Sequence, residues 1–228
     1  DIDKPLPKLG KRMITTGGHY AYLKIAEGCD KHCTYCIIPK VRGSFRSVPM
    51  ESLLAEARTL ADGGVKELIL VAQETTLYGM DLYGKKCLPD LLHELAKIPG
   101  IYWIRILYCY PEEITDELIE AIATEPKVCH YLDIPIQHCN SKILQLMNRR
   151  GDGAFLRDLF AKLRQQIPGL VLRTSVITGL PGEGEEEFAE LCAFLKEMRM
   201  ERVGAFPFSP EEGTPAFDME HPSESVAQ

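Results

Sequence analysis

The chain has 228 residues, and its 26 Lys and Arg against 33 Asp and Glu give a formal net charge of −7. This balance is the opposite of what a domain needs to bind a phosphate backbone over a wide surface, so nucleic acid is not expected as its main partner. The longest apolar runs, such as residues 68–72, are far too short to cross a membrane, and nothing near residue 1 resembles a signal peptide. We therefore expect a cytoplasmic protein whose eight cysteines are reduced.

Strand-like apolar stretches alternate with helix-like stretches along the chain. The expected strands, each bounded by Gly, Pro or a polar turn, are residues 22–26, 67–72, 102–107, 131–134, 170–176 and 203–206. The expected helices, in which apolar residues recur at helical spacing, are 53–61, 90–97, 118–122, 156–163 and 188–198. These apolar stripes, which in the last helix include Phe188, Leu191, Cys192, Leu195 and Met198, are expected to face the core. Helical crossovers imply parallel strands, in an open doubly wound sheet or in part of a barrel.

Both ends of the chain are expected to be linkers. Residues 1–18 and 211–228 are rich in Pro, Gly and small polar residues, and residue 1 is Asp rather than Met. The predicted organisation is therefore a linker at 1–18, a core domain at 19–210 and a linker at 211–228, all cut from a longer protein.

Three cysteines, Cys29, Cys33 and Cys36, are spaced C-x-x-x-C-x-x-C on the loop after the first expected strand. Thiolates are soft ligands, and three of them on so short a loop can hold one face of an iron–sulfur cube. Because no fourth cysteine continues the run, one iron would keep an open position for chemistry. A structural zinc site needs four ligands, and His32 lies too close to Cys33 to share a tetrahedral metal with it. A disulfide framework does not suit a reducing compartment.

This spacing, with Tyr35 before the last cysteine, resembles the signature of the radical S-adenosylmethionine (SAM) superfamily. The resemblance implies that the three cysteines hold one [4Fe-4S] cluster and that SAM chelates its open iron. An electron from such a cluster cleaves SAM to a 5′-deoxyadenosyl radical. The fold of that family is a partial (β/α)6 barrel with parallel strands, which matches the six strands expected here. We therefore predict an α/β protein of this architecture.

Polar residues at the expected strand ends become candidate SAM contacts, because ligands of parallel sheets bind beyond the carboxyl ends of the strands. Gln73 and Glu74 follow the second strand and suit the methionyl end of SAM, whose ammonium needs acceptors. Gln137 follows the fourth strand and is a candidate for the ribose hydroxyls or the amino-acid end. Arg150 is a candidate partner of the SAM carboxylate.

Three further residues complete the predicted cofactor site. Tyr35 lies within the cysteine motif, Arg173 is expected to face an anion inside the barrel, and Phe206 ends the sixth strand as a wall for adenine. His138 stands beside Gln137, but a lone histidine at such a position is more often structural than functional. The five cysteines outside the motif have no metal-site spacing and are expected to be structural.

Within the superfamily, the resemblance narrows to the methylthiotransferases, which insert sulfur into an unactivated C–H bond and methylate it. The stretches that carry it are residues 27–43, 73–79, 131–138, 178–183 and 209–213. Residues 73–76 and 133–138 look like the group that modifies the β-carbon of an aspartate in a small-subunit ribosomal protein. The sister group, which modifies an adenosine in transfer RNA, is the alternative. A basic ribosomal protein also suits the negative net charge.

The resemblance also implies what lies outside this chain. Proteins of this family have an N-terminal domain that holds a second, auxiliary cluster and a C-terminal β domain that engages the substrate, and neither is expected within residues 1–228. This chain alone is expected at most to cleave SAM, with electrons from a donor such as flavodoxin or ferredoxin. An alternative of another class is a non-catalytic zinc-binding or scaffold module, which would carry one zinc ion and bind no SAM.

Overall fold

The computed structural model describes residues 2, 13, 15 and 17–227. Within these residues one six-stranded sheet has the order β1-β4-β5-β6-β7-β8, and every neighbouring pair of strands is parallel. The strands are β1 (Tyr20–Lys24), β4 (Glu67–Val71), β5 (Trp103–Ile106), β6 (Val128–Asp133), β7 (Val171–Thr178) and β8 (Arg202–Pro207). The six predicted strands are confirmed. The largest difference is at the fourth, which begins at Val128 rather than at residue 131.

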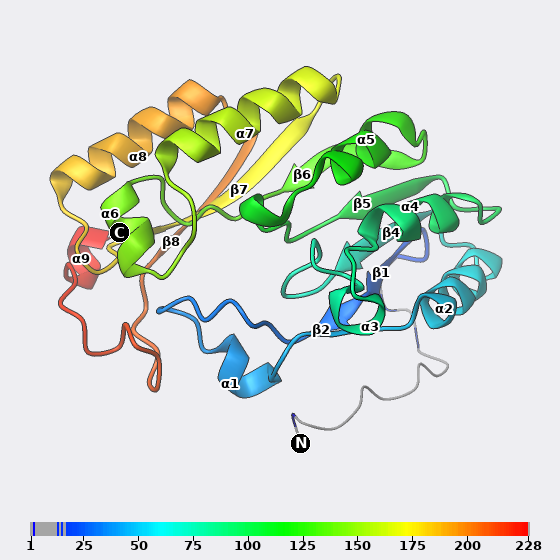
Figure 1. Cartoon of the computed structure of the whole chain (residues 1–228), viewed down its shortest axis with the longest axis horizontal. Coiled ribbons are helices and arrows are strands. Elements are labelled where there is room, and N and C mark those ends of the chain that lie inside the picture. Colours follow the sequence, from blue (N-terminus) through cyan, green and yellow to red (C-terminus); the bar gives the residue numbers. More distant parts are fainter. Residues whose placement is uncertain (1, 3–12, 14, 16, 228) are drawn as a thin grey trace.

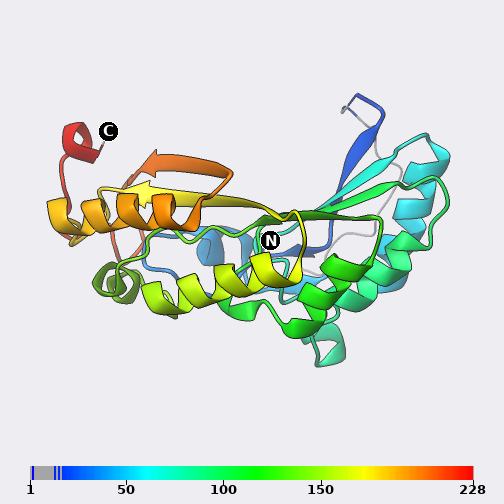
Figure 2. The same ribbon diagram turned by 90° about the horizontal axis from the view of Figure 1, so that it is seen from above.

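The sheet is an open arc in which β1 and β8 are the two edges, so the partial-barrel prediction is confirmed. The longer helices cover its outer face (Figures 1 and 2). They are α2 (Met50–Asp62), α4 (Leu88–Ala96), α5 (Asp116–Thr124), α7 (Gly153–Gln166) and α8 (Glu185–Met198). No helix of the described residues combines the length and the apolar character that a membrane crossing requires.

The two faces of the sheet differ in character, as β7 illustrates. Leu172, Thr174 and Val176 are buried under the outer helices, whereas Arg173, Ser175 and Ile177 are half-buried on the inner, concave face. Alternate residues of a strand point to opposite faces, so one strand supplies both the core and the wall of the barrel interior. The apolar core therefore lies between the sheet and the helices, and the inner face is left for ligands.

Short elements follow the carboxyl ends of the strands and surround the mouth of the barrel. They are the antiparallel pair β2 (Ala26–Glu27) and β3 (Arg46–Ser47), the helices α1 (Ile38–Arg42), α3 (Met80–Tyr83), α6 (Ser141–Leu146) and α9 (Glu224–Ala227), and the 3-10 turn η1 (Pro111–Glu113). The first predicted strand, residues 22–26, ends earlier than predicted, because Ala26 pairs with Ser47 in β3 instead of continuing β1.

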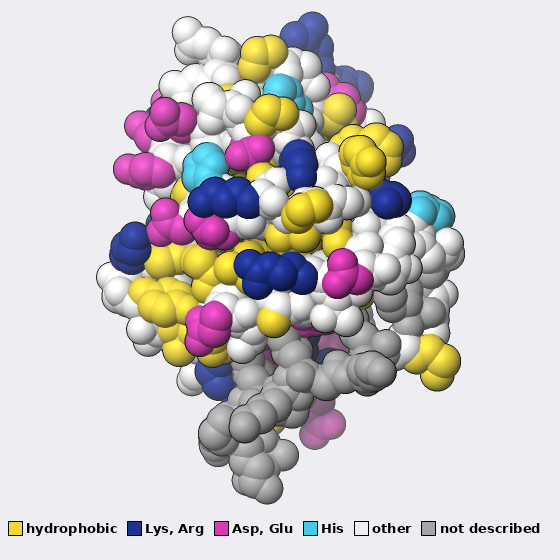
Figure 3. All heavy atoms as spheres, turned by 90° about the vertical axis from the view of Figure 1, so that its right-hand side faces the viewer, with side chains coloured by type: hydrophobic (Ala, Val, Ile, Leu, Met, Phe, Trp, Pro, Cys, Tyr) yellow, Lys and Arg dark blue, Asp and Glu magenta, His cyan; other side chains and the backbone are white. Residues whose placement is uncertain are grey.

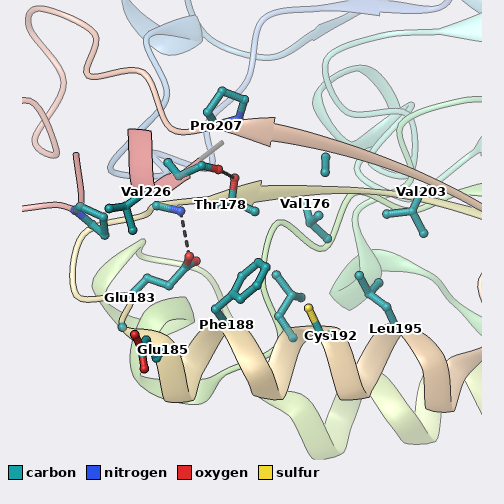
Figure 4. A pocket seen from close by; sticks show the side chains of 16 residues that line it. Val176, Thr178, Glu183, Glu185, Phe188, Cys192, Leu195, Val203, Pro207 and Val226 are labelled. Carbon is teal, nitrogen blue, oxygen red and sulfur yellow. Dashed lines mark hydrogen bonds between the residues drawn. The ribbon is translucent and has the colours of Figure 1, made fainter. Parts of the chain in front are cut away.

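Helix α8 departs from the predicted core stripe. Phe194 is fully buried, but Phe188 is 45% exposed. Together with Cys192 and Leu195, Phe188 lines a cavity of about 710 Å³ between α8 and the outer face of β7 and β8, where Val203 faces it (Figure 4). The prediction that the whole stripe is core was therefore wrong for Phe188. The spacing of apolar residues predicts which side of a helix is apolar, but it does not reveal how much of that side a neighbour covers.

Candidate cluster and cofactor site

The cysteine loop, residues 28–37, begins with a backbone conformation that requires glycine. Gly28 has φ of +80°, and a Cβ atom on it would lie 2.1 Å from the carbonyl oxygen of Ser44. A side chain at this position would therefore meet both backbone strain and a steric clash. The chain can turn sharply here from β2 into the loop, and this turn brings Cys29 to the mouth of the barrel.

Segments far apart in the sequence hold this loop. The backbone N–H of Gly28 donates to Oε1 of Gln73 at 2.8 Å, beyond the end of β4. The backbone N–H of Thr34 donates to the carbonyl oxygen of Met147 at 3.2 Å, and the Thr34 carbonyl oxygen accepts from the N–H of Ala216 at 2.9 Å. Ala216 is fully buried, so the described part of segment 211–228, which was expected to be a linker, packs on the cysteine loop. Protein contacts alone therefore support the loop geometry.

The three thiols of the loop suit a cluster better than a single metal ion. Cys33 is buried and Cys29 and Cys36 are half-buried, and burial raises the pKa of Cys29 to about 11 and also raises that of Cys36. A bound cation must therefore stabilise these groups as thiolates. Among the described residues no three His, Cys, Asp or Glu side chains are placed to hold one metal ion. A [4Fe-4S] cube does not need the three thiolates to surround one ion, because each thiolate binds a different iron atom.

A cavity of about 320 Å³ opens beside the loop, at the carboxyl ends of β5, β6, β7 and β8. It brings together three of the predicted cofactor residues, Tyr35, Gln137 and Phe206. Gln137 has φ of +68°, and its backbone bonds to Ser175 and Ile177 of β7 at 2.9 Å each. Left-handed backbone is unfavourable for a residue with a side chain and is often retained at functional sites. This bend places Gln137 on the cavity wall.

The two residues predicted after β4 have different environments. The side-chain oxygen of Gln73 accepts a hydrogen bond from the N–H of Gly28, so Gln73 contacts the cysteine loop itself. Glu74 is buried, and its Oε1 accepts from the N–H of Thr76 at 2.9 Å and from the Thr76 hydroxyl. Its Oε2 is also buried but has no hydrogen-bond partner, and burial raises the pKa of this carboxyl to about 7. An unpartnered carboxylate oxygen close to Cys29 suits a cationic ligand group.

Gln73 and Glu74 do not line this cavity, and the remaining candidates lie outside it as well. Arg150 is exposed, and Arg173 donates from Nη1 to Oδ1 of Asp133 at 2.6 Å on the inner face of the sheet. His138 is fully buried, and its Nδ1 accepts from the backbone N–H of Asn140 at 2.9 Å. Its Nε2 is also buried and lies 3.2 Å from Oε2 of Glu183, and a structural role for His138 stays a prediction from the sequence.

Two aromatic or cationic residues at the site were not predicted. Arg149, not its neighbour Arg150, is the buried arginine, and its Nη2 donates to the carbonyl oxygen of Pro135 at 2.8 Å. Tyr108 lines the cavity with φ of +60° and a half-exposed ring. No sequence signal separates the two adjacent arginines, since their roles depend on where the loop before α7 turns. Tyr108 directly follows the third strand, and in sequence an aromatic residue at such a position is equally compatible with core packing.

The family of the chain follows from comparison with known proteins. The model of the radical SAM superfamily matches residues 23–195, and the chain belongs to that superfamily. Membership implies a [4Fe-4S] cluster and SAM. Among solved structures, the radical SAM methyltransferase TsrM from Kitasatospora setae superposes with a TM-score of 0.71 at 16% identity, covering 88% of this chain and 38% of that one. Coproporphyrinogen III oxidase HemN from Escherichia coli gives 0.65 at 21% identity, covering 92% and 50%. These likenesses show the fold alone.

Curated relatives are more similar in sequence. Ribosomal protein uS12 methylthiotransferase RimO from Lachnoclostridium phytofermentans is 61% identical over 219 residues, which cover 96% of this chain and 50% of that protein. The protein of the same name from Alkaliphilus oremlandii is 53% identical, covering 90% and 47%. The chain therefore spans about half the length of the curated relatives it matches. These relatives favour the ribosomal-protein group over the transfer-RNA group and over a zinc-binding scaffold.

Proposed function

We propose that this chain is the radical SAM domain of a methylthiotransferase that adds a methylthio group to the β-carbon of an aspartate in ribosomal protein uS12. The observation that carries the proposal is the 61% identity, over 96% of the chain, to a protein named for methylthiolation of uS12. Because the chain spans about half of that relative, the complete reaction belongs to the whole protein. This chain supplies the radical step.

In this proposal Cys29, Cys33 and Cys36 are the cluster ligands. The loop that carries them is held from β4, from α6 and from segment 211–228, so little conformational entropy remains to be lost when the cluster binds. When bound, the cluster and SAM would supply the radical chemistry that removes a hydrogen atom from the substrate carbon. The protein residues position these groups and keep water away from them.

The cavity of about 320 Å³ is the proposed SAM site, and its size lies within the usual range for small ligands. Glu74 does not line this cavity, and its unpartnered Oε2 is the acceptor that we assign to the SAM ammonium. Gln137 offers its amide to the ribose or to the amino-acid end, and the rings of Tyr35 and Phe206 form apolar walls. For Gln73, Arg150 and Arg173 a SAM contact stays a prediction from the sequence.

The proposed function also implies a protein substrate and an electron donor. A basic ribosomal protein is complementary to the net charge of −7. On the side nearest α2, Lys and Arg side chains are interspersed with Asp and Glu, which gives that face no extended basic region for nucleic acid among the residues described (Figure 3). We assign the second cluster to the N-terminal region of the whole protein, and a flavodoxin or ferredoxin would donate the electrons. The activity would take place in the cytoplasm. Residues 1–18 and 211–228 would connect this domain to the other domains.

Anaerobic reconstitution of the chain with iron and sulfide tests the site. Electron paramagnetic resonance of the reduced protein should show a four-iron cluster whose spectrum changes when SAM is added. Cys33→Ala should abolish the signal. Cys192→Ala, the same substitution on α8 at the outer cavity, should leave it intact. Stoichiometric zinc and no cluster would contradict the proposal.

The substrate is tested with the whole protein, which carries the regions that this chain lacks. Incubation with SAM and a reductant should add a methylthio group to purified uS12, detected by mass spectrometry. Replacement of the modified aspartate by asparagine should prevent the reaction. Methylthiolation of transfer RNA and not of uS12 would establish the sister activity instead.

A further inference from the structure

Arg173 and Asp133 form an ion pair on the inner face of the sheet. The two residues are directly opposite each other in the register of β6 and β7, and Nη1 of Arg173 donates to Oδ1 of Asp133 at 2.6 Å. The side chain of Asp133 is 2% exposed, whereas that of Arg173 is 35% exposed. The buried carboxylate therefore fixes the guanidinium, which stays accessible from the interior of the barrel.

The guanidinium of Arg173 has hydrogen-bonding capacity that the protein does not use. Arginine carries five N–H donors in a planar fork, and Asp133 is the one hydrogen-bond partner of Arg173 in the part of the chain that the structure describes. A fork held in place by one carboxylate can bind a second carboxylate through its other N–H groups. Because its orientation is already fixed, the entropy cost of that binding is small. Arg173 is therefore prepared to bind a carboxylate.

Arg173 lies beside the proposed SAM cavity, on the side away from the mouth of the barrel. Ser175 and Ile177, the next two residues of β7 on the inner face, line this cavity. A strand advances about 3.3 Å per residue, so the Cα atoms of Arg173 and Ser175 are roughly 7 Å apart. A carboxylate bound by Arg173 would therefore lie next to that cavity.

Two other assignments explain this carboxylate site less well. In the proposed cofactor site the carboxylate of SAM belongs at the open iron, beside the cysteine loop, so SAM does not require a second guanidinium on β7. Arg105 is another arginine on the inner face, but the register of β5, β6 and β7 places it one inner-face position farther from the mouth. It is paired with Glu67 at 2.6 Å, and its guanidinium lies 4.9 Å from the ring centroid of Tyr131. Arg173 is thus the inner-face arginine nearer to the cavity.

We propose that Arg173, held by Asp133, binds the side-chain carboxylate of the aspartate that is modified, and that it thereby selects aspartate over an uncharged residue. The inference rests on the proposed function, in which the β-carbon of an aspartate in uS12 is the target. That β-carbon is bonded directly to the carboxylate carbon, so a guanidinium that holds the carboxylate also positions the reacting carbon. Asp133 is a positioning residue in this account, since it acts through Arg173.

The test is a calorimetric binding measurement with the whole protein, purified uS12 and the uS12 variant in which the modified aspartate is replaced by asparagine. The wild type should bind the aspartate form about tenfold more tightly, the difference expected for one charge-assisted hydrogen bond. Arg173→Gln can still donate to Asp133 and should bind the two forms about equally. Arg173→Lys keeps the charge but not the fork and should show an intermediate preference. Arg105→Gln is the matched control and should keep the tenfold preference.

The outcomes separate this inference from the proposed function. A wild type that methylthiolates uS12 but binds both forms equally would overturn the inference alone. An Arg173→Gln variant that keeps the preference and loses the spectral response to SAM would also overturn it, because Arg173 would then be a SAM contact. A whole protein that neither binds nor modifies uS12 would overturn both.

A second variant keeps the test decisive if Arg173→Gln does not fold, as judged by circular dichroism. The double variant Arg173→Leu with Asp133→Leu then replaces it, because this variant leaves no buried carboxylate unpaired. It should likewise bind the two forms of uS12 about equally. If the double variant does not fold either, the ion pair is structural and its assignment to the substrate is wrong.

Discussion

The side chain of Gln73 holds the backbone of Gly28, 45 residues away in the sequence, through a hydrogen bond of 2.8 Å from the Gly28 N–H to Oε1. The bond links the residue after β4 to the first residue of the cysteine loop. The loop therefore depends on a neighbouring strand of the sheet for its position. Residues that contact no cofactor atom can decide whether a cluster assembles.

Gln73→Leu tests this link. The substitution leaves the half-buried N–H of Gly28 without its acceptor, and we expect the free energy of unfolding to fall by about 1–2 kcal/mol, with less iron retained after reconstitution. Gln165→Leu makes the same chemical change on the exposed face of α7 and should alter neither quantity. Urea denaturation and iron analysis measure both. Equal iron content in the two variants would show that the bond does not support the loop.

Gly28→Ala addresses the turn itself. The new methyl group would lie 2.1 Å from the Ser44 carbonyl oxygen, at a φ of +80°. We expect destabilisation by more than about 2 kcal/mol and loss of cluster assembly, because strain and clash act together. Gly64→Ala is the control, since Gly64 also has positive φ but nothing within 4 Å of the added Cβ. It should cost about 1–2 kcal/mol and leave iron binding unchanged. Similar losses in both variants would mean that the clash is relieved by local movement.

Glu74 should make the stability of the cluster-free chain depend on pH. Burial raises its pKa from 4.5 to about 7, so between these values the folded chain keeps a proton that the unfolded chain releases. The free energy of unfolding should therefore fall as the pH rises through this window, by roughly 3 kcal/mol for this buried group.

Glu74→Gln keeps an acceptor for Thr76 but cannot ionise. Urea denaturation at about pH 5 and about pH 8 should therefore show a smaller loss of stability for this variant than for the wild type. Groups other than Glu74 contribute equally to both proteins and cancel in the comparison. The same loss in both would mean that Glu74 titrates near its ordinary pKa.

Two phenylalanines of α8 should differ in their contribution to stability. Phe194 is fully buried, so Phe194→Ala should lower the free energy of unfolding by about 3–5 kcal/mol. Phe188 is 45% exposed on the wall of the outer cavity, and Phe188→Ala should cost only about 1 kcal/mol. Chemical denaturation of the two variants gives the comparison. Equal losses would indicate that the cavity around Phe188 is closed in solution.

Much of the fold was predictable because the determinants are local. Each strand of the sheet is an apolar stretch bounded by turn residues, and crossover helices of suitable length imply parallel pairing. The cysteine spacing identified the family for the same reason, since the three thiols lie within eight consecutive residues. Coverage of a helix by a distant segment is not local, and this is why Phe188 was assigned to the core.

By itself, the sequence determined the order of strands and helices, the cysteine loop and the class of chemistry, all of which depend on neighbours along the chain. The tertiary structure alone decided which polar residues meet. Arg149 is buried and Arg150 exposed although they are adjacent, and the oxygen of Gln73 is taken by Gly28. These outcomes depend on contacts between separate segments of the chain, such as Gly28 with Gln73, which differ by 45 positions, and Arg149 with Pro135, which differ by 14. Local pattern carries no information about such contacts, because packing fixes them only when the whole sheet has formed.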